Sequence, residues 1–204
     1  MAAAERIFAE HGPDGASLRD IARAAGQRNN SAVHYHFGGR DALLVEVLRR
    51  RMTEINAVRE DRLVALDSTG DEPLLIDLVA VLLEPLADHV RSAGRRSTYA
   101  QFMVRSMPVV DFDHGPIAEV NAVQHEIGLR MHRLLPELSA TDFQRRVTLA
   151  LTMAVGALAD FERRWNRMAT VDPGLDATVA EVVTMTAAAL QAPSPVPGLP
   201  TGPR

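Results

Sequence analysis

The side chains best suited to bind nucleic acid lie in one short polar stretch near the N-terminus. Its exposed candidates are Arg28, Asn29, Asn30, Ser31, His34 and Tyr35. Asn pairs bidentately with adenine and Arg with guanine or phosphate, while Ser, His and Tyr hydrogen-bond to bases or to phosphates. On an ordinary helical hairpin the same side chains would form a solvated polar face, so their role depends on the elements that position them.

The elements predicted around this stretch form a helix-turn-helix. Ser17 followed by Asp20 is an N-terminal capping pattern, and Gly26 ends the helix of about nine residues that begins there. Residues 29–37 are poor helix formers, so this second short helix needs support from packing. A helix over about residues 2–11 precedes both. In such a unit the second helix enters the major groove of DNA.

Two helix N-termini in this region could bind phosphate. Arg40 opens a long helix predicted over residues 40–66, where a cation opposes the helix dipole. A DNA phosphate at that position would satisfy both the dipole and the guanidinium. Ser17 offers a hydroxyl and free N–H groups at the start of its own helix. Both residues therefore join the candidate contacts.

Three stretches of this region resemble the N-terminal signature of the TetR family of transcription repressors. The first, Ile7-Phe8-Ala9-Glu10-His11-Gly12, is similar to the end of the family's first helix. The second, Ile21-Ala22-Arg23-Ala24-Ala25-Gly26, is similar to its I-A-x-x-A-G helix and turn. The third, from His34-Tyr35-His36-Phe37 to Arg40-Asp41-Ala42-Leu43, is similar to its aromatic L-Y-x-Y-F-x-x-K-x-x-L stretch. Together they cover about the first 50 residues.

The resemblance implies roles for individual residues. It implies phosphate contacts from Ser17, His34, His36 and Arg40, and base or backbone contacts from Asn29, Asn30, Ser31 and Tyr35. The chain departs from the family in a turn one residue longer at 27–30, in Ser31-Ala32 where a glycine-threonine pair is usual, and in a first helix shorter by about two turns. The last departure leaves open a natural start upstream of Met1.

The rest of the chain predicts an all-α body. Apolar spacings of three and four indicate helices at about 73–92, 95–107, 115–135, 141–168 and 175–191. We therefore predict an all-α fold with a three-helix helix-turn-helix head over 1–48 and a helical ligand-binding and dimerisation domain over 49–192. A Pro-rich tail over 193–204 is expected to be disordered or extended.

The resemblance implies that the body forms a homodimer through its last two helices and holds an effector pocket. Residues 147–159 are apolar on nearly every face, as expected of a helix packed on its own core and on a partner, although a buried helix in a monomer would look the same. Thioethers and amphipathic rings often line ligand cavities. The candidates for a small-molecule effector are Tyr99, Phe102, Met103, Met107, His125, Phe161 and Trp165, each of which would serve equally well in a plain core.

Composition sets broader limits. The chain has 204 residues, a net charge of -4 and no cysteine, which excludes disulfide and thiolate chemistry. Residues 1–51 carry eight Arg and six acidic residues, so the N-terminal end is the basic one. No signal peptide is recognisable, and the longest apolar run is well short of the ~20 residues that span a bilayer. We expect a cytoplasmic protein with no membrane partner that binds a palindromic DNA operator.

Two other function classes stay open. An enzyme could use Asp111-Phe112-Asp113-His114 as a metal cluster, or His125 and His132, which are seven apart on one helix face. No P-loop, dinucleotide fingerprint, nucleophile elbow or zinc motif accompanies them, so we expect no catalysis, no cofactor and no metal. A helical interaction module whose head does not bind DNA is the other alternative, which the acidic total charge allows.

Overall fold

The N-terminal head is built on a helix that bends at a glycine. The computed structural model describes residues 1–27, 35–112, 114–168 and 174–193, and within them it is all-helical. In α1 (Ala2–Gly15), Gly12 has φ 72° and ψ 169°, so the first helical segment ends at the predicted place. Pro13, whose fixed φ suits a first helical position, then starts one more turn that the sequence did not predict.

The second helix, α2 (Leu18–Ala24), has the predicted caps at both ends. The Ser17 hydroxyl oxygen accepts a hydrogen bond from the Asp20 N–H at 3.1 Å. At the other end Gly26 has φ 70°, and the Gln27 N–H donates to the Ala22 carbonyl at 2.9 Å, which closes the helix. The seven residues of α2 are fewer than the nine expected, because capping residues lie outside the helix itself.

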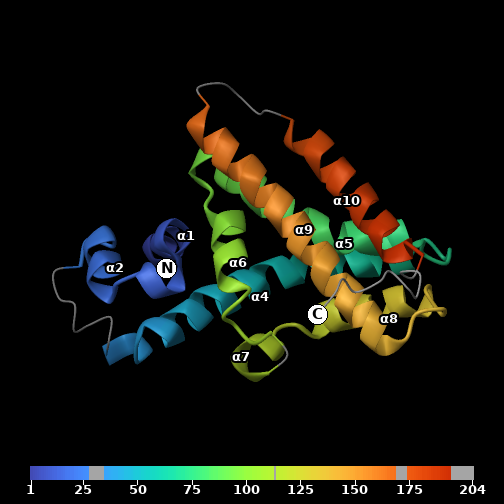
Figure 1. Ribbon diagram of the computed structural model, residues 1–204, viewed down its shortest axis with the longest axis horizontal. Coiled ribbons are helices and arrows are strands. Elements are labelled where there is room, and N and C mark those ends of the chain that lie inside the picture. The colour runs from blue at the N-terminus through green and yellow to red at the C-terminus, as the bar shows by residue number, and fades with distance from the viewer. Residues whose placement is uncertain (28–34, 113, 169–173, 194–204) are drawn as a thin grey trace, which may run out of the picture.

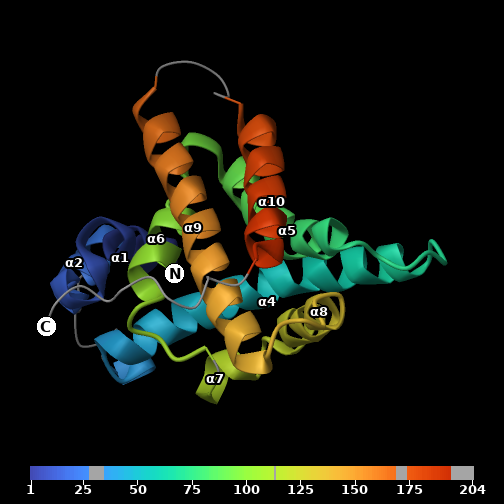
Figure 2. The ribbon, with the colours of Figure 1, turned by 45° about the vertical axis from the view of Figure 1, so that its right-hand side comes forward.

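A long helix, α4 (Arg40–Asp67), joins the head to the body and runs along the length of the body (Figures 1 and 2). Apolar spacing in this helix predicts an inward face of Leu44, Val47, Leu48, Ile55 and Val58, and the first four are buried. The prediction for Val58 was wrong, since this side chain is 38% exposed. The polar residues Asn56 and Arg59 take the inward positions in that turn, because each finds hydrogen-bond partners on neighbouring elements.

The body consists of helices of varied length around a shared core. Its elements are α5 (Leu75–Ala93), a short 3-10 turn (Gly94–Arg96), α6 (Tyr99–Ser106), α7 (Gly115–Ala118), α8 (Ala122–Arg133), α9 (Ala140–Arg167) and α10 (Leu175–Gln191). The helices α9 and α10 pack side by side in both views (Figures 1 and 2). None of the helices in the described ranges combines the length and apolarity needed to cross a membrane.

Two predicted helices begin or divide differently in the structure, and a distant side chain accounts for each difference. The helix expected over 95–107 begins only at Tyr99, where the buried Glu162 carboxylate of α9 accepts the Gln101 N–H at 2.9 Å and so caps α6. The helix expected over 115–135 is divided into α7 and α8. There the Asn56 amide donates to the Val120 carbonyl at 2.6 Å, taking an acceptor that a continuous helix would use.

The hydrophobic core is continuous from the head to the body. Phe8 of α1 and Phe102 of α6 are fully buried, with ring centroids 6.3 Å apart, and Tyr99 lies 6.4 Å from Phe102. Burial of this kind is the main favourable contribution to folding. The head therefore packs directly on α6 and is held at a defined place on the body.

Candidate functional site

The described part of the predicted contact surface is exposed at the head. Tyr35 is 87% exposed, His36 is also exposed, and their rings meet edge to face with centroids 5.7 Å apart. Ser17 lies at the exposed N-terminus of α2. Its hydroxyl oxygen accepts the capping hydrogen bond, so the hydroxyl hydrogen can still donate to another group. Five other candidates lie outside the described residues: Arg28, Asn29, Asn30, Ser31 and His34.

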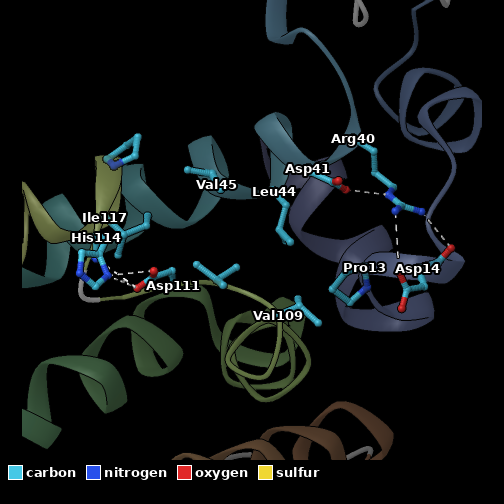
Figure 3. A pocket seen from close by; sticks show the side chains of 12 residues that line it. Pro13, Asp14, Arg40, Asp41, Leu44, Val45, Val109, Asp111, His114 and Ile117 are labelled. Carbon is cyan, nitrogen blue, oxygen red and sulfur yellow. Dashed lines mark hydrogen bonds and ion pairs between the residues drawn. The ribbon is translucent and has the colours of Figure 1, made fainter.

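Arg40 makes contacts that the sequence did not predict. Its Nη1 group donates to the Asp14 carbonyl at 3.2 Å, and its Nε group donates to an Asp41 carboxylate oxygen at 3.1 Å (Figure 3). The Asp14 carboxylate lies 3.7 Å from the same guanidinium. Arg40 thus ties the start of α4 to the end of α1, and with 36% of its side chain exposed it still presents charge to solvent.

Arg19 was not among the predicted contacts, although it is exposed on α2, two residues after the Ser17 cap. Its neighbour Arg23 is paired with Asp20 at 2.5 Å, whereas Arg19 makes no ion pair within the described ranges. The signal available in the sequence was its place in the first turn of the capped helix. Arg19 is therefore a further cation on the surface that carries Ser17.

A cavity of about 360 Å³ lies between the head and the body, beside Arg40. Figure 3 shows Pro13, Asp14 and Arg40 on one side of it and Asp111, His114 and Ile117 on the other. His114 Nδ1 lies 3.0 Å from the Asp111 carboxylate. In the ranges described, no three side chains of the metal-binding types come together.

A larger cavity, of about 820 Å³, lies within the body. It is lined by side chains of α4, α5, α6, α7, α8 and α9 and by the segment that precedes α7, and it is partly open to solvent. Three of the seven predicted ligand residues, Met103, Met107 and His125, line it. Its size falls in the range of cavities that hold small molecules. We call it the body cavity.

The other four predicted ligand residues are buried in the core and do not line the body cavity. Tyr99 and Phe102 pack at the junction of head and body, where the Tyr99 ring also meets His89 edge to face at 4.9 Å. Phe161 and Trp165 pack against each other along α9, with centroids 5.7 Å apart. Aromatic side chains at helical spacing serve as core and as cavity lining alike, so sequence could not separate the two groups.

The most unusual group in the body cavity is a buried arginine that the sequence pattern did not single out. Arg59 lines this cavity and is only 2% exposed. Its guanidinium donates to the Leu82 carbonyl from two nitrogens, at 2.7 and 3.0 Å, to Asn56 Oδ1 at 2.7 Å and to Gln124 Oε1 at 3.3 Å. Burial lowers the pKa of Arg59 to about 10, so the group stays charged at neutral pH.

The histidines considered for an enzymatic site have different surroundings. His125 is exposed at the body cavity, whereas His132 is half-buried, with its Nε2 atom 3.0 Å from the Leu138 carbonyl and its ring stacked on Phe143 at 4.6 Å. A backbone carbonyl and a stacked ring are structural partners and do not activate a base or a nucleophile. This geometry offers no arrangement for catalysis by the pair.

Comparisons with known proteins agree with this geometry. Residues 1–47 match the family described as bacterial regulatory proteins, tetR family. The chain is 35% identical over 85 residues to the HTH-type transcriptional repressor AcnR of Corynebacterium glutamicum. The match covers 40% of this chain and 44% of the relative, so this chain spans less than half the length of that relative.

Two solved structures share the fold over nearly the whole chain. A TetR-like transcriptional regulator from Rhodococcus sp. RHA1 has a TM-score of 0.56 at 18% identity, covering 94% of this chain and 93% of its own. The TetR family transcriptional regulator PfmR from Thermus thermophilus has a TM-score of 0.52 at 16% identity, covering 95% of each chain. At these identities the likeness concerns the fold alone.

Proposed function

Because this chain belongs to the tetR family of bacterial regulatory proteins, with its residues 1–47 as the matched part, we propose that it is a ligand-responsive transcription repressor. In this proposal it binds a palindromic operator as a homodimer, in the cytoplasm, and releases the operator when a small molecule occupies the body cavity. The observation that carries the proposal is the head, where a capped α2 and the Gly26 turn lead into the polar stretch before α4.

The exposed polar groups of the head support DNA binding. Ser17 and Arg19 at the start of α2, and Arg40 at the start of α4, lie where two helix N-termini offer N–H groups to phosphate. Tyr35 and His36 are exposed just before α4 and add hydrogen-bonding rings to the same end of the molecule. Base identity would be read mainly by the predicted residues that the structure does not describe.

The proposal is tested by selecting DNA from random or genomic fragments with the full chain. A repressor of this kind enriches an inverted repeat, and its affinity for that repeat falls steeply as salt concentration rises, because bound phosphates release counterions. If the chain retains no sequence and shows no binding at low salt, it is a helical interaction module and the proposal fails. A selected site without two-fold symmetry would reject the homodimer.

An exposed apolar surface on α9 and α10 supports the homodimer. Leu149, Met153 and Met185 are 59%, 55% and 58% exposed on these two adjacent helices. Exposed apolar side chains on adjacent helices commonly mark an interface. Gly156 follows Met153 on α9, and a Cβ added at Gly156 would meet no atom within 4 Å, so this position has no packing role inside the monomer. We propose that this face is where two copies meet.

The two cavities offer a route from ligand to head. Val110 and Asp111 line both the body cavity and the cavity beside Arg40, so one short segment forms a wall of each. Helix α4 also reaches both, through Arg40 at its start and Arg59 in its second half. A ligand that displaces this shared wall would therefore move the contacts that hold the start of α4 against α1.

Such coupling is reciprocal, so DNA must weaken ligand binding by the factor by which ligand weakens DNA binding. A coupling free energy of about 1–3 kcal/mol would lower operator affinity roughly 5- to 150-fold. The test follows operator release and ligand affinity together. A ligand that binds free and operator-bound protein equally well is not the effector.

A further inference from the structure

Arg59 carries a positive charge that the described residues do not neutralise. All of its hydrogen-bond acceptors are neutral, namely the Leu82 carbonyl and the side-chain amides of Asn56 and Gln124. Within the described ranges no Asp or Glu lies within ion-pair distance of it, although nearly every other Arg near α4 has such a partner, such as Arg62 beside Asp88. Burying a charge without a counter-charge is strongly unfavourable.

The remaining surface of the body cavity is mostly apolar. Leu86, Met103, Met131, Phe143 and Leu151 line it. Met and Leu side chains adapt to ligands of varied shape, and a mostly apolar wall with few polar groups is typical of small-molecule sites. The cavity thus offers one buried cation to a ligand that is otherwise apolar.

The polar groups nearest to that cation suit an anion of low charge. Gln124 is the weakest of the partners of Arg59, with an Nη1 to Oε1 distance of 3.3 Å against 2.7 Å to Asn56. Of the two N–H hydrogens on Nη2, one donates to the Leu82 carbonyl and the other is available to a further acceptor. A carboxylate entering from the cavity could accept from both Nη1 and Nη2, replacing the long contact to Gln124. Charge-assisted bonds of this type are stronger than bonds to amides.

We propose that the ligand of the body cavity is a monocarboxylate with an apolar body, whose carboxylate is bound by Arg59 beside Gln124 and whose hydrocarbon part lies against the Met, Leu and Phe wall. The carboxylate supplies the counter-charge that the protein lacks there. The role of this ligand as effector rests on the proposed function, whereas its binding does not require DNA.

A purely structural role is the alternative for Arg59. The guanidinium joins α4 to α5 through the Leu82 carbonyl. The neighbouring Val81 carbonyl lacks its usual helical N–H donor, because Pro85 has no N–H. Replacing Arg59 could therefore unfold the body and reveal nothing about a ligand. The substitution Gln124→Glu avoids this difficulty, because it places a carboxylate next to Nη1 while keeping the size and shape of the side chain and every other contact of Arg59.

The experiment measures binding of two acids, octanoate and 4-phenylbutyrate, and of their uncharged primary amides to the full chain by calorimetry without DNA. The wild-type chain is expected to bind at least one acid about tenfold or more tightly than its amide. In Gln124→Glu the internal carboxylate occupies the place of the ligand. This variant should lose the preference for the acid, bind acid and amide within about twofold of each other, and melt no lower than the wild type.

The matched control is Gln191→Glu, which makes the same charge change at an exposed position of α10 that does not line the cavity. It should keep the wild-type preference. Equal binding of acid and amide by the wild type, or an acid preference that survives in Gln124→Glu, would overturn the proposal. Loss of the preference in both variants would show an effect of net charge and would equally overturn the role of Arg59.

The outcomes separate this inference from the proposed function. Operator affinity of the same two variants is measured without any acid. If the operator is bound but no acid is preferred over its amide, the ligand class is wrong and the repressor proposal stands. If an acid is bound but no operator is found, the cavity is assigned and the DNA-binding role fails.

Discussion

Arg51 Nε on α4 lies 2.6 Å from Glu5 Oε2 on α1, and this ion pair joins the head to the body at a place where the Glu5 side chain is only 7% exposed. The Thr98 hydroxyl, just before α6, lies 3.3 Å from the other Glu5 oxygen, and Arg51 also contacts Glu54 at 2.9 Å. Three elements therefore meet at one buried carboxylate. This contact therefore adds to the packing of Phe8 on Phe102 in holding the head against α4 and α6.

We expect Glu5→Gln to lower the free energy of unfolding by about 1–3 kcal/mol, because it leaves a partly buried guanidinium with only Glu54. Urea denaturation followed by circular dichroism measures the change. The control is Glu10→Gln, which removes an exposed pair with Arg6 and should cost at most about 1 kcal/mol. Equal effects of the two substitutions would show that burial at the junction contributes nothing.

Ser17 should contribute separately to stability and to DNA binding. Ser17→Ala removes a helix cap and should cost about 1 kcal/mol, and it should also weaken DNA binding by removing the hydroxyl donor. Ser17→Asp keeps a good cap but sets a carboxylate against phosphate, so it should preserve stability and weaken DNA binding.

Ser139→Ala is the control, since Ser139 caps α9 in the same way, with its oxygen 3.1 Å from the Asp142 N–H. It should lose comparable stability and keep operator affinity. Normal DNA binding by Ser17→Asp would remove Ser17 from the phosphate contacts.

Arg40→Gln should weaken binding to all DNA sequences about equally and reduce the slope of log affinity against log salt by about one unit, because a phosphate contact carries no base identity. The slope comes from titrations at several salt concentrations. Arg145→Gln, which changes an exposed and paired Arg on α9, is the control and should leave the slope unchanged. An altered sequence preference in Arg40→Gln would contradict a phosphate contact.

Gly156→Glu should convert the proposed homodimer to monomers without unfolding them, because a Cβ at this position meets no atom of the monomer within 4 Å and the carboxylate would be buried against the partner copy. Light scattering at micromolar concentration measures the mass, and circular dichroism verifies the fold. Ala57→Glu, at an exposed position of α4, should remain dimeric. A dimeric Gly156→Glu variant would place the interface elsewhere.

His89 should make the protein less stable in mild acid. Burial lowers the pKa of His89, and the positive charge of Arg51 lowers it further, against the opposing charges of Glu5 and Glu54. The folded chain therefore binds a proton at His89 less readily than the unfolded chain does. The contribution of neutral His89 to the free energy of unfolding is therefore fully present above about pH 6.5, the usual pKa of His, and declines as the pH falls below that value.

Urea denaturation at about pH 7.5 and about pH 5.5, on either side of the usual pKa of His, should show a smaller pH effect for His89→Gln than for the wild type. His11→Gln, at an exposed position of α1, should behave as the wild type does. An unchanged pH effect in His89→Gln would mean that other groups account for the acid sensitivity.

Features that depend on neighbouring residues were predictable from the sequence. The Ser17 cap, the Gly26 terminus and the bounds of α4, α9 and α10 follow from side chains within a few positions of each helix end. The resemblance of the first 50 residues to the TetR family rested on the same local pattern, and the match over residues 1–47 confirmed it.

Tertiary contacts decided the rest, because their partners lie far apart in sequence. Glu162 sets the start of α6 from more than 60 positions away, Asn56 divides α7 from α8, and Asp14 engages Arg40. The inward turn of Arg59 likewise needs the Leu82 carbonyl of α5 and the amide of Gln124 on α8. A sequence pattern records that a residue is polar, but only the packed helices determine whether its partner is water, a neighbouring carbonyl or a ligand.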